Sequence, residues 1–118
     1  MEKNFEVIIL SEKSVLTSKV RSELDLLERH VTMLKAVWEH QPIGIIRLSE
    51  MLSYPQHKVR YTLRVLEQEG LIRPSAEGAV ITEGLQPFLS RLGVLLDEMS
   101  DTANSLRKSL KGHQWESF

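Results

Sequence analysis

Apolar residues follow a helical period in two long segments of the chain. In residues 14–40 they recur every three or four positions and fall on one face of a helix. Gln41-Pro42 ends this segment, because the residue before a proline avoids helical backbone. The same spacing returns over residues 83–111, with Thr82 as the predicted N-cap and Gly112 as the end. The pattern predicts two long helices.

Shorter elements occupy the segment between the two long helices. Residues 47–52 and 55–69 each carry one apolar face and predict short helices, the second opened by its proline. Gly70 suits the left-handed residue that commonly follows a helix. Residues 71–74 and 79–82 flank a small polar turn and predict a β-hairpin.

The order of these elements predicts the fold class. Two further extended stretches are expected, a strand at 5–10 and a single bridge or turn at 42–46. Three helices followed by a hairpin make a mainly α chain with a small β-hairpin wing, a winged helix-turn-helix with long flanking N- and C-terminal helices. The expected divisions are an N-terminal strand and dimer arm (1–30), a DNA-binding core (31–82), a C-terminal dimerisation helix (83–111) and a flexible tail (112–118).

Residues 31–82 resemble the winged-helix core of small prokaryotic transcriptional regulators of the MarR, ArsR and PadR types. The likeness lies in LSEML, from Leu48, and in HKVRYTLRVLEQEGLI, to Ile72. The two flanking helices resemble those of small archaeal dimeric winged-helix proteins. The chain differs at Ser53, where the family often has Gly, and at Pro55, where it commonly has Ser or Thr. The resemblance implies a DNA-binding regulator of transcription.

The helix predicted at 55–69 carries most of the local positive charge. If its apolar residues Val59, Leu63 and Leu66 face inward, a polar face points outward. That face and its flanks comprise His57, Lys58, Arg60, Tyr61, Arg64 and Gln68. Residues 55–74 hold four Lys or Arg against two Glu, a local charge of +2, while the other 98 residues sum to −3. Concentrated cations on one helix are typical of a helix that enters a DNA groove.

Residue types on this helix suit the reading of double-stranded DNA. Arginine forms bidentate hydrogen bonds with guanine or with phosphate, and glutamine forms them with adenine. The predicted phosphate contacts are Lys58, Arg60 and Arg73, and the predicted base contacts are Gln56, His57, Tyr61 and Arg64. The alternative is a winged-helix adaptor that binds another protein without DNA, which the overall charge of −1 supports. A merely solvated helix face remains open, and a non-specific chromatin protein fits the net charge less well.

Apolar residues on the two long helices exceed what a core of about fifty residues can cover. The residues expected to remain exposed are Leu16, Val20, Leu24, Leu92, Leu95, Met99, Leu106 and Leu110. They predict a homodimer formed through one or both long helices, the alternative being that the two helices pair within one chain. A dimer would present two copies of helix 55–69 to successive major grooves.

Composition excludes several other classes of protein. The 118 residues include 42% apolar and 26% charged residues and no cysteine, which excludes disulfides and thiol chemistry. The longest apolar run has four residues, and no signal-peptide core opens the chain, so a soluble cytoplasmic protein without a membrane partner is expected. No phosphate-binding loop or catalytic motif occurs, so we expect neither enzyme activity nor a cofactor. A small-molecule effector is left open.

The histidines and acidic residues do not form a predicted metal site. His30 and His40 are ten positions apart on one helix, and no acid completes a set with ligand spacing. The acidic trio Asp97, Glu98 and Asp101 is interpreted as a solvated helix face. Trp38 is interpreted as a core residue at the end of its helical stripe.

Overall fold

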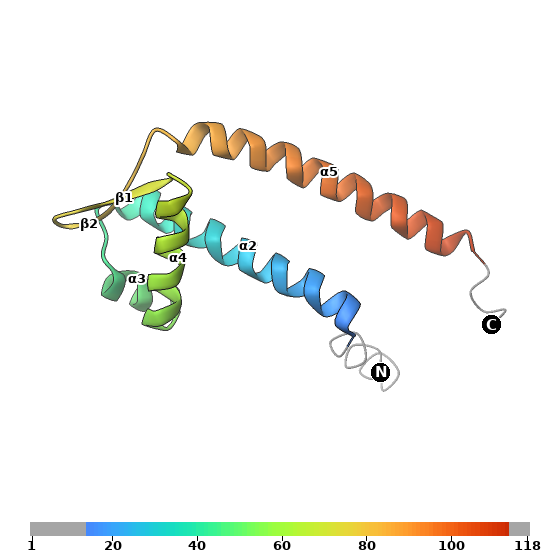
Figure 1. Cartoon of the computed structure of the whole chain (residues 1–118), viewed down its shortest axis with the longest axis horizontal. Helices are drawn as coiled ribbons and strands as arrows, with labels where there is room; N and C mark the ends of the chain where they lie inside the picture. Colours follow the sequence, from blue (N-terminus) through green and yellow to red (C-terminus); the bar gives the residue numbers. More distant parts are fainter. Residues whose placement is uncertain (1–13, 114–118) are drawn as a thin grey trace. The chain divides into compact units, whose positions relative to one another are not determined.

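A computed structural model describes residues 14–113 of the chain (Figure 1). The described elements are α2 (Val15–His40), α3 (Ile45–Leu52), α4 (Gln56–Gln68), β1 (Ile72–Ser75), β2 (Gly78–Ile81) and α5 (Leu85–Lys111). The chain divides into two compact units, the first ending at Thr82 and the second starting at Glu83. The prediction of a mainly helical chain with one small hairpin is confirmed. The strand expected at 5–10 lies outside the described residues.

Helix α2 is buried only along its C-terminal part. It begins after Ser14, whose hydroxyl accepts a hydrogen bond from the Thr17 N–H at 3.4 Å and so satisfies one free helical donor. Its buried residues are Met33, Leu34, Ala36 and Val37. This part of α2 packs against α3, α4 and β2. The apolar stripe therefore serves the core at its C-terminal end and leaves Leu16, Val20 and Leu24 exposed upstream.

A tight turn joins α3 to α4. Ser53 adopts left-handed backbone, with φ 56° and ψ 35°, and ends α3. The Ser49 hydroxyl donates to the Tyr54 carbonyl at 2.5 Å and holds the turn together. Pro55 has extended backbone and is the N-cap of α4 rather than its first helical residue. The sequence predicts both helices, but α3 begins two residues earlier than expected because the chain turns into helix directly after Gly44.

A left-handed glycine leads from α4 into the hairpin. Gly70 has φ 77°, and the Leu71 N–H donates to the Leu66 carbonyl at 3.0 Å, as expected for a helix closed by glycine. Strands β1 and β2 are antiparallel, and their register runs from Ile72 opposite Ile81 to Ser75 opposite Gly78. The hairpin is confirmed, with a shorter tip than predicted because Ser75 and Gly78 are paired.

A third extended segment joins the hairpin through one residue. Ile43 forms an isolated antiparallel bridge with Ala79, in which Ile43 N–H donates at 3.2 Å and Ala79 N–H donates at 2.8 Å. Ile43 is 1% exposed and follows the cis Gln41-Pro42 peptide bond. The single bridge predicted for 42–46 is confirmed, and it fixes the hairpin beside the start of α3.

The core of the first unit forms where α2, α3, α4 and the hairpin meet. Its fully buried side chains are Met33, Val37, Ile43, Leu48, Val59 and Thr62. On α4 the buried residues are Val59, Thr62 and Leu66, while Leu63 is only half-buried. The prediction that Leu63 is the central buried residue of this face is therefore wrong by one position. Helical spacing allows either Thr62 or Leu63 to face inward, and the prediction chose Leu63 because it is apolar.

Replacing Thr62 by valine is expected to stabilise the protein by about 1 kcal/mol. The Thr62 hydroxyl oxygen is buried without a hydrogen-bond partner among the described residues, so the folded state bears its desolvation cost. Valine keeps the shape and removes the hydroxyl. Urea unfolding measures the effect, with Thr62→Ser as the control that keeps the hydroxyl and is expected to destabilise. A less stable Thr62→Val variant would contradict this account.

His30 on α2 is expected to make the stability of the protein depend on pH. Burial lowers its pKa from the ordinary value of 6.5, and the charge of Arg29 lowers the pKa further. The His30 Nε2 atom is buried without a hydrogen-bond partner among residues 14–113. The folded state thus binds the proton less readily than the unfolded state, so the His30 contribution is complete above pH 6.5 and decreases as the pH falls below it.

Substituting His30 by glutamine is expected to flatten this pH dependence. The free energy of unfolding of the parent protein should fall on acidification from neutral pH toward pH 5.5, and that of His30→Gln should fall less, because its side chain does not titrate. Urea unfolding at a series of pH values provides the measurement. Equal slopes for the two proteins would show that His30 does not contribute.

Helix α5 begins with Gly84 as its N-cap, not with Thr82. The Thr82 hydroxyl instead donates to the Gly70 carbonyl at 2.5 Å, and the Thr82 N–H donates to the Leu71 carbonyl at 3.0 Å. The prediction of Thr82 as a helix cap is therefore wrong, because this side chain closes the hairpin against the end of α4. At its other end α5 stops at Gly112, as expected, where the glycine N–H donates to the Lys108 carbonyl.

One face of α5 carries apolar residues separated by alternating steps of four and three. We call these residues the α5 seam: Leu85, Leu89, Leu92, Leu96, Met99, Ala103, Leu106 and Leu110. Leu85 is the one buried residue of α5, and the rest of the seam is half-buried or exposed. An average step of 3.5 residues is the coiled-coil period. The seam includes four of the predicted dimerisation residues, and Leu95 lies beside it.

Candidate nucleic-acid interface

Helix α4 presents its polar side chains to solvent. The burial of Val59, Thr62 and Leu66 fixes the helix orientation and turns the opposite side outward. We call this exposed surface the α4 face: Gln56, His57, Lys58, Arg60, Tyr61 and Arg64. Tyr61 is 52% exposed, although an aromatic ring gains most from burial. The outward face predicted from the helical period is confirmed, because its residues are all exposed: His57, Lys58, Arg60, Tyr61, Arg64 and Gln68.

The cations of the α4 face are not neutralised within the described part of the chain. Among residues 14–113 the ion pairs join Arg21 to Asp25 and His40 to Glu39, and none involves α4. No acidic residue occurs in the first turn of α4, and Glu67 is its first acid. The guanidinium and ammonium groups of this face are therefore available to an anionic partner.

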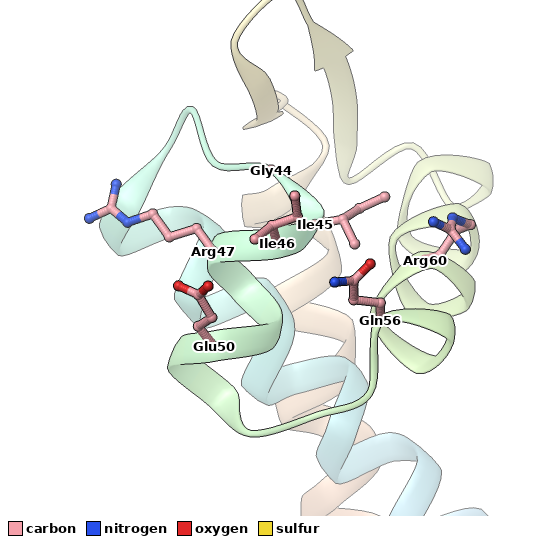
Figure 2. Close-up of a pocket in the computed structure, with 7 residues that line it drawn as sticks. All are labelled: Gly44, Ile45, Ile46, Arg47, Glu50, Gln56 and Arg60. Atoms are coloured by element: carbon pink, nitrogen blue, oxygen red, sulfur yellow. The ribbon is translucent and has the colours of Figure 1, made fainter.

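An open pocket of about 660 Å³ lies between the starts of α3 and α4 (Figure 2). Its lining residues are Gly44, Ile45, Ile46, Arg47, Glu50, Gln56 and Arg60. Figure 2 shows Gln56 of α4 and Ile45 of α3 facing this space, with Arg47 and Glu50 farther along α3. The pocket thus adds residues of α3 to the edge of the α4 face.

The free backbone donors at these two helix starts add positive potential to the pocket. Neither Gly44 before α3 nor Pro55 before α4 caps its helix with a side chain. Unbonded N–H groups at a helix N-terminus attract anions such as phosphate. Arg47, in the first turn of α3, was not predicted as a site residue. The sequence predicts that α3 starts at residue 47. Because α3 starts at residue 45, Arg47 lies within its first turn, beside the free N–H groups.

Arg73 lies apart from this pocket. It is exposed on β1, which follows the C-terminal end of α4, whereas Gln56 lies at the N-terminal end (Figure 1). The hairpin tip beyond it is Ala76-Glu77, and the Ser75 hydroxyl donates to the Gly78 carbonyl at 2.6 Å. The acidic Glu77 at the tip would repel a phosphate. Arg73 is therefore the one residue of the hairpin that is predicted to contact DNA.

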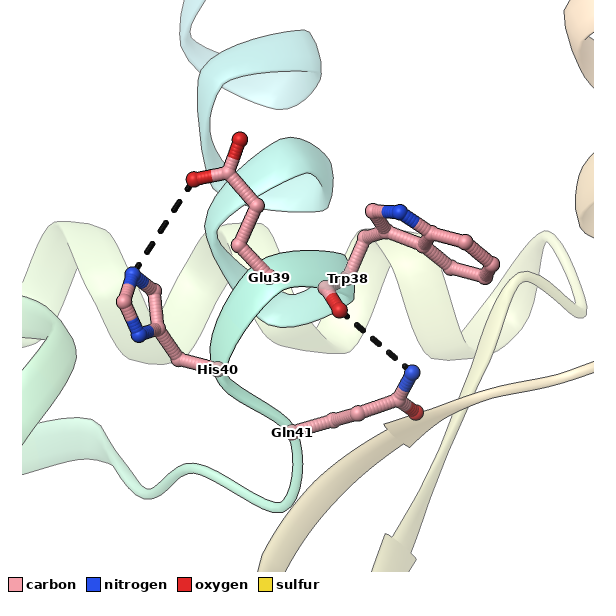
Figure 3. Close-up of polar contacts among 4 residues, drawn as sticks. All are labelled: Trp38, Glu39, His40 and Gln41. Carbon is pink, nitrogen blue, oxygen red and sulfur yellow. Dashed lines mark hydrogen bonds and ion pairs between the residues drawn. The ribbon is translucent and has the colours of Figure 1, made fainter.

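The end of α2 is tied to the hairpin by Gln41. Its side-chain oxygen accepts from the Ile81 N–H at 2.8 Å. Its amide nitrogen donates to the Trp38 carbonyl at 3.5 Å (Figure 3). Trp38 itself is 55% exposed, so its interpretation as a core residue is wrong. The buried face of α2 passes through Leu34 and Val37, and the next position in sequence turns the indole outward.

The other sequence-based assignments are placed as follows. His40 lies 4.0 Å from the Glu39 carboxylate, and no group of three metal-ligating side chains occurs among the described residues. The acidic trio on α5 is exposed, as predicted. Of the predicted dimerisation residues, Leu16 is the most exposed at 83%, and Leu92 is half-buried. No helix within residues 14–113 has the length and apolar character needed to cross a membrane.

Comparison with known proteins shows the fold. No family model and no curated protein matches the chain. Among solved structures, the chain is similar to the activation domain of the phage T4 transcription factor MotA, with a TM-score of 0.50 and 24% sequence identity. The match covers 67% of this chain and 82% of the MotA domain. A likeness at this level of identity concerns the fold alone.

Proposed function

We propose that the protein is a sequence-specific double-stranded DNA-binding protein that regulates transcription in the cytoplasm and has no enzymatic activity. In this proposal residues 31–82 form a winged helix-turn-helix, with α4 as the helix that enters the major groove and the β1–β2 hairpin as the wing. The observation that carries the proposal is the α4 face, an exposed helix surface with three unpaired cations and no acid before Glu67. The fold that the chain shares with a domain of a transcription factor is consistent with it.

Each residue of the α4 face has a specific role in this proposal. Lys58 and Arg60 contact phosphates at the groove edge, and Arg73 contacts a phosphate from the wing. Arg47 joins them from α3, where free helical N–H groups also favour a phosphate. The residues that contact base edges are Gln56, His57, Tyr61 and Arg64, which are all exposed. About four phosphate contacts in each protomer predict a steep loss of affinity with rising salt.

A protein–protein adaptor is the second candidate. The pocket favours it, because the apolar Ile45 and the 64% exposed Ile46 lie beside arginines and would suit an acidic, partly apolar peptide. The chain's net charge of −1 also fits an adaptor better than a general DNA-coating protein. The MotA domain that shares the fold is an activation domain.

Binding to random-sequence duplex DNA at low salt separates the two candidates. A DNA-binding protein is expected to shift the duplex and to lose affinity linearly on a log–log plot against salt. Selection from a random duplex pool then tests sequence preference and the symmetry of the site. A protein that shows no salt-dependent binding to duplex DNA would exclude the first candidate and leave the adaptor.

A further inference from the structure

The α5 seam is an apolar surface that the described part of the chain leaves exposed. The side chains near its C-terminal end are the most exposed, with Leu106 at 61% and Leu110 at 57%. The alternating steps of four and three persist from Leu85 to Leu110 without interruption. A stripe with a period of 3.5 residues drifts only slowly around a straight helix. It therefore stays in contact with a second helix that coils around the first.

The residues beside the seam favour close approach of another helix. Gly93 and Ser100 flank one side with small side chains, and Phe88 and Leu95 widen the apolar surface on the other. The acidic residues Asp97, Glu98 and Asp101 and the basic residues Lys108 and Lys111 all lie off the seam and its flanks. Arg107 is the one charged residue in a flanking position. A helix partner would therefore bury apolar groups with little desolvation of charge.

We propose that the α5 seam pairs with the α5 seam of a second copy of this chain in antiparallel orientation. A two-fold pair needs one self-complementary surface, and the seam provides it. With the two helices fully overlapped, Leu89 lies level with Leu106 of the second copy and Leu96 with Met99 of the second copy. The seam residues alternate between the two core positions of the heptad, a and d. At each of these levels an a residue meets a d residue of the second copy, as antiparallel packing requires.

Charge favours the antiparallel over the parallel orientation. In a parallel pair Arg107, the one charged residue that flanks the seam, would lie level with Arg107 of the second copy, and Lys108 and Lys111 would add positive charge to both helices farther from the contact. In the antiparallel pair the basic segment 107–111 lies level with residues 84–88, which carry no charge. The acidic segment 97–101 lies near its copy in both cases, so the basic segment decides. This surface lies on α5, and its pairing does not depend on DNA binding by α4.

A matched pair of substitutions on α5 tests the interface. Leu106 and Val94 are both apolar and similarly exposed, at 61% and 58%, but Val94 lies off the seam. Light scattering and sedimentation at micromolar concentration are expected to show a dimer for the parent protein. Leu106→Glu should raise the dimer dissociation constant by about 100-fold or more, because it places unpaired charge in the seam, and Val94→Glu should change it less than about threefold.

Either of two results would overturn this interface. A monomeric parent protein would mean that the seam does not bind a second copy and is covered within its own chain. Equal dimerisation by the Leu106→Glu and Val94→Glu variants would place the contact elsewhere. Circular dichroism keeps the test interpretable, because both substituted side chains are largely exposed and the helix content of both variants should match that of the parent.

Cysteine cross-linking tests the orientation, and the chain contains no native cysteine to interfere. A mixture of Leu89→Cys and a size-tagged Leu106→Cys variant is expected to form a disulfide between the two variants on mild oxidation. Leu89→Cys alone should not cross-link, because its two copies would lie 17 positions, about 25 Å, apart along the antiparallel pair. Efficient self-cross-linking of either single variant would show a parallel pair and overturn the antiparallel arrangement.

Discussion

Replacing Arg60 and Arg64 together by alanine is expected to weaken binding to the selected duplex about 100-fold. Arg64 is assigned to a base edge, where removal of a good contact costs about 1–3 kcal/mol, and Arg60 to a phosphate. Both side chains are exposed and make no ion pair with the other described residues, so their loss leaves the core intact. Alanine also favours the helix. Mobility shifts over a range of salt concentrations measure the change in affinity.

The control for this prediction removes the same charge from another surface. Arg91 and Lys108 are exposed on α5 and lie off the α5 seam, and the Arg91→Ala, Lys108→Ala double variant also lowers the net charge by two. It is expected to retain nearly all of the affinity, which would show that position on α4 matters and not total charge. Unchanged affinity of the Arg60→Ala, Arg64→Ala variant would contradict the assignment of α4 as the DNA-reading helix.

Substitution of Lys58 separates positioning from base reading on the same helix. Lys58→Ala is expected to weaken binding to all sequences alike and to reduce the salt slope by about one, since a phosphate contact carries no sequence information. Arg64→Ala should instead weaken the preferred site most and relax its specificity. If the two variants lost affinity to the same extent on every sequence, α4 would bind DNA without reading it.

The boundaries of the elements could be predicted where a residue forbids the alternative backbone. Pro42 ends α2, and Gly70 provides the left-handed residue after α4, because few other residues adopt these conformations at low cost. Boundaries that depend on contacts with distant residues could not be predicted from the local sequence. Thr82 was predicted to cap α5 from local sequence, yet its hydroxyl bonds to Gly70, twelve residues earlier in the chain.

The candidate site was predictable to the extent that it lies on one helix. The outward side of α4 followed from its period, so the exposure of Tyr61 and Arg64 could be predicted without knowledge of the neighbouring elements. Arg47 and the pocket could not, because they depend on how α3 packs beside α4. The interpretation of Trp38 as a core residue was wrong for a related reason: the packing of α3, α4 and the hairpin against α2 determines which side of α2 is covered.

Gly78 is expected to be the glycine of the first unit that least tolerates a side chain. It has φ 136°, a backbone conformation that L residues rarely adopt. A Cβ atom added there would lie 2.5 Å from the carbonyl carbon and 2.7 Å from the nitrogen of Ile43. Backbone atoms cannot rotate away as a side chain can. The strain would fall on the two hydrogen bonds between Ile43 and Ala79, which hold the hairpin against the core.

The Gly78→Ala variant is therefore expected to lose about 3–5 kcal/mol of unfolding free energy, from backbone strain and from the weakened bridge together. Gly44→Ala is the matched control, because Gly44 has φ −98° and a Cβ there would meet no atom within 4 Å. It should cost no more than about 1 kcal/mol, because alanine is a poorer helix N-cap than glycine. Urea unfolding of both variants provides the comparison. Similar stabilities of the two variants would show that breaking the contact between the hairpin and Ile43 costs no unfolding free energy. The hydrogen bonds of Gln41 and Thr82 would then be the contacts that hold the proposed wing to the core.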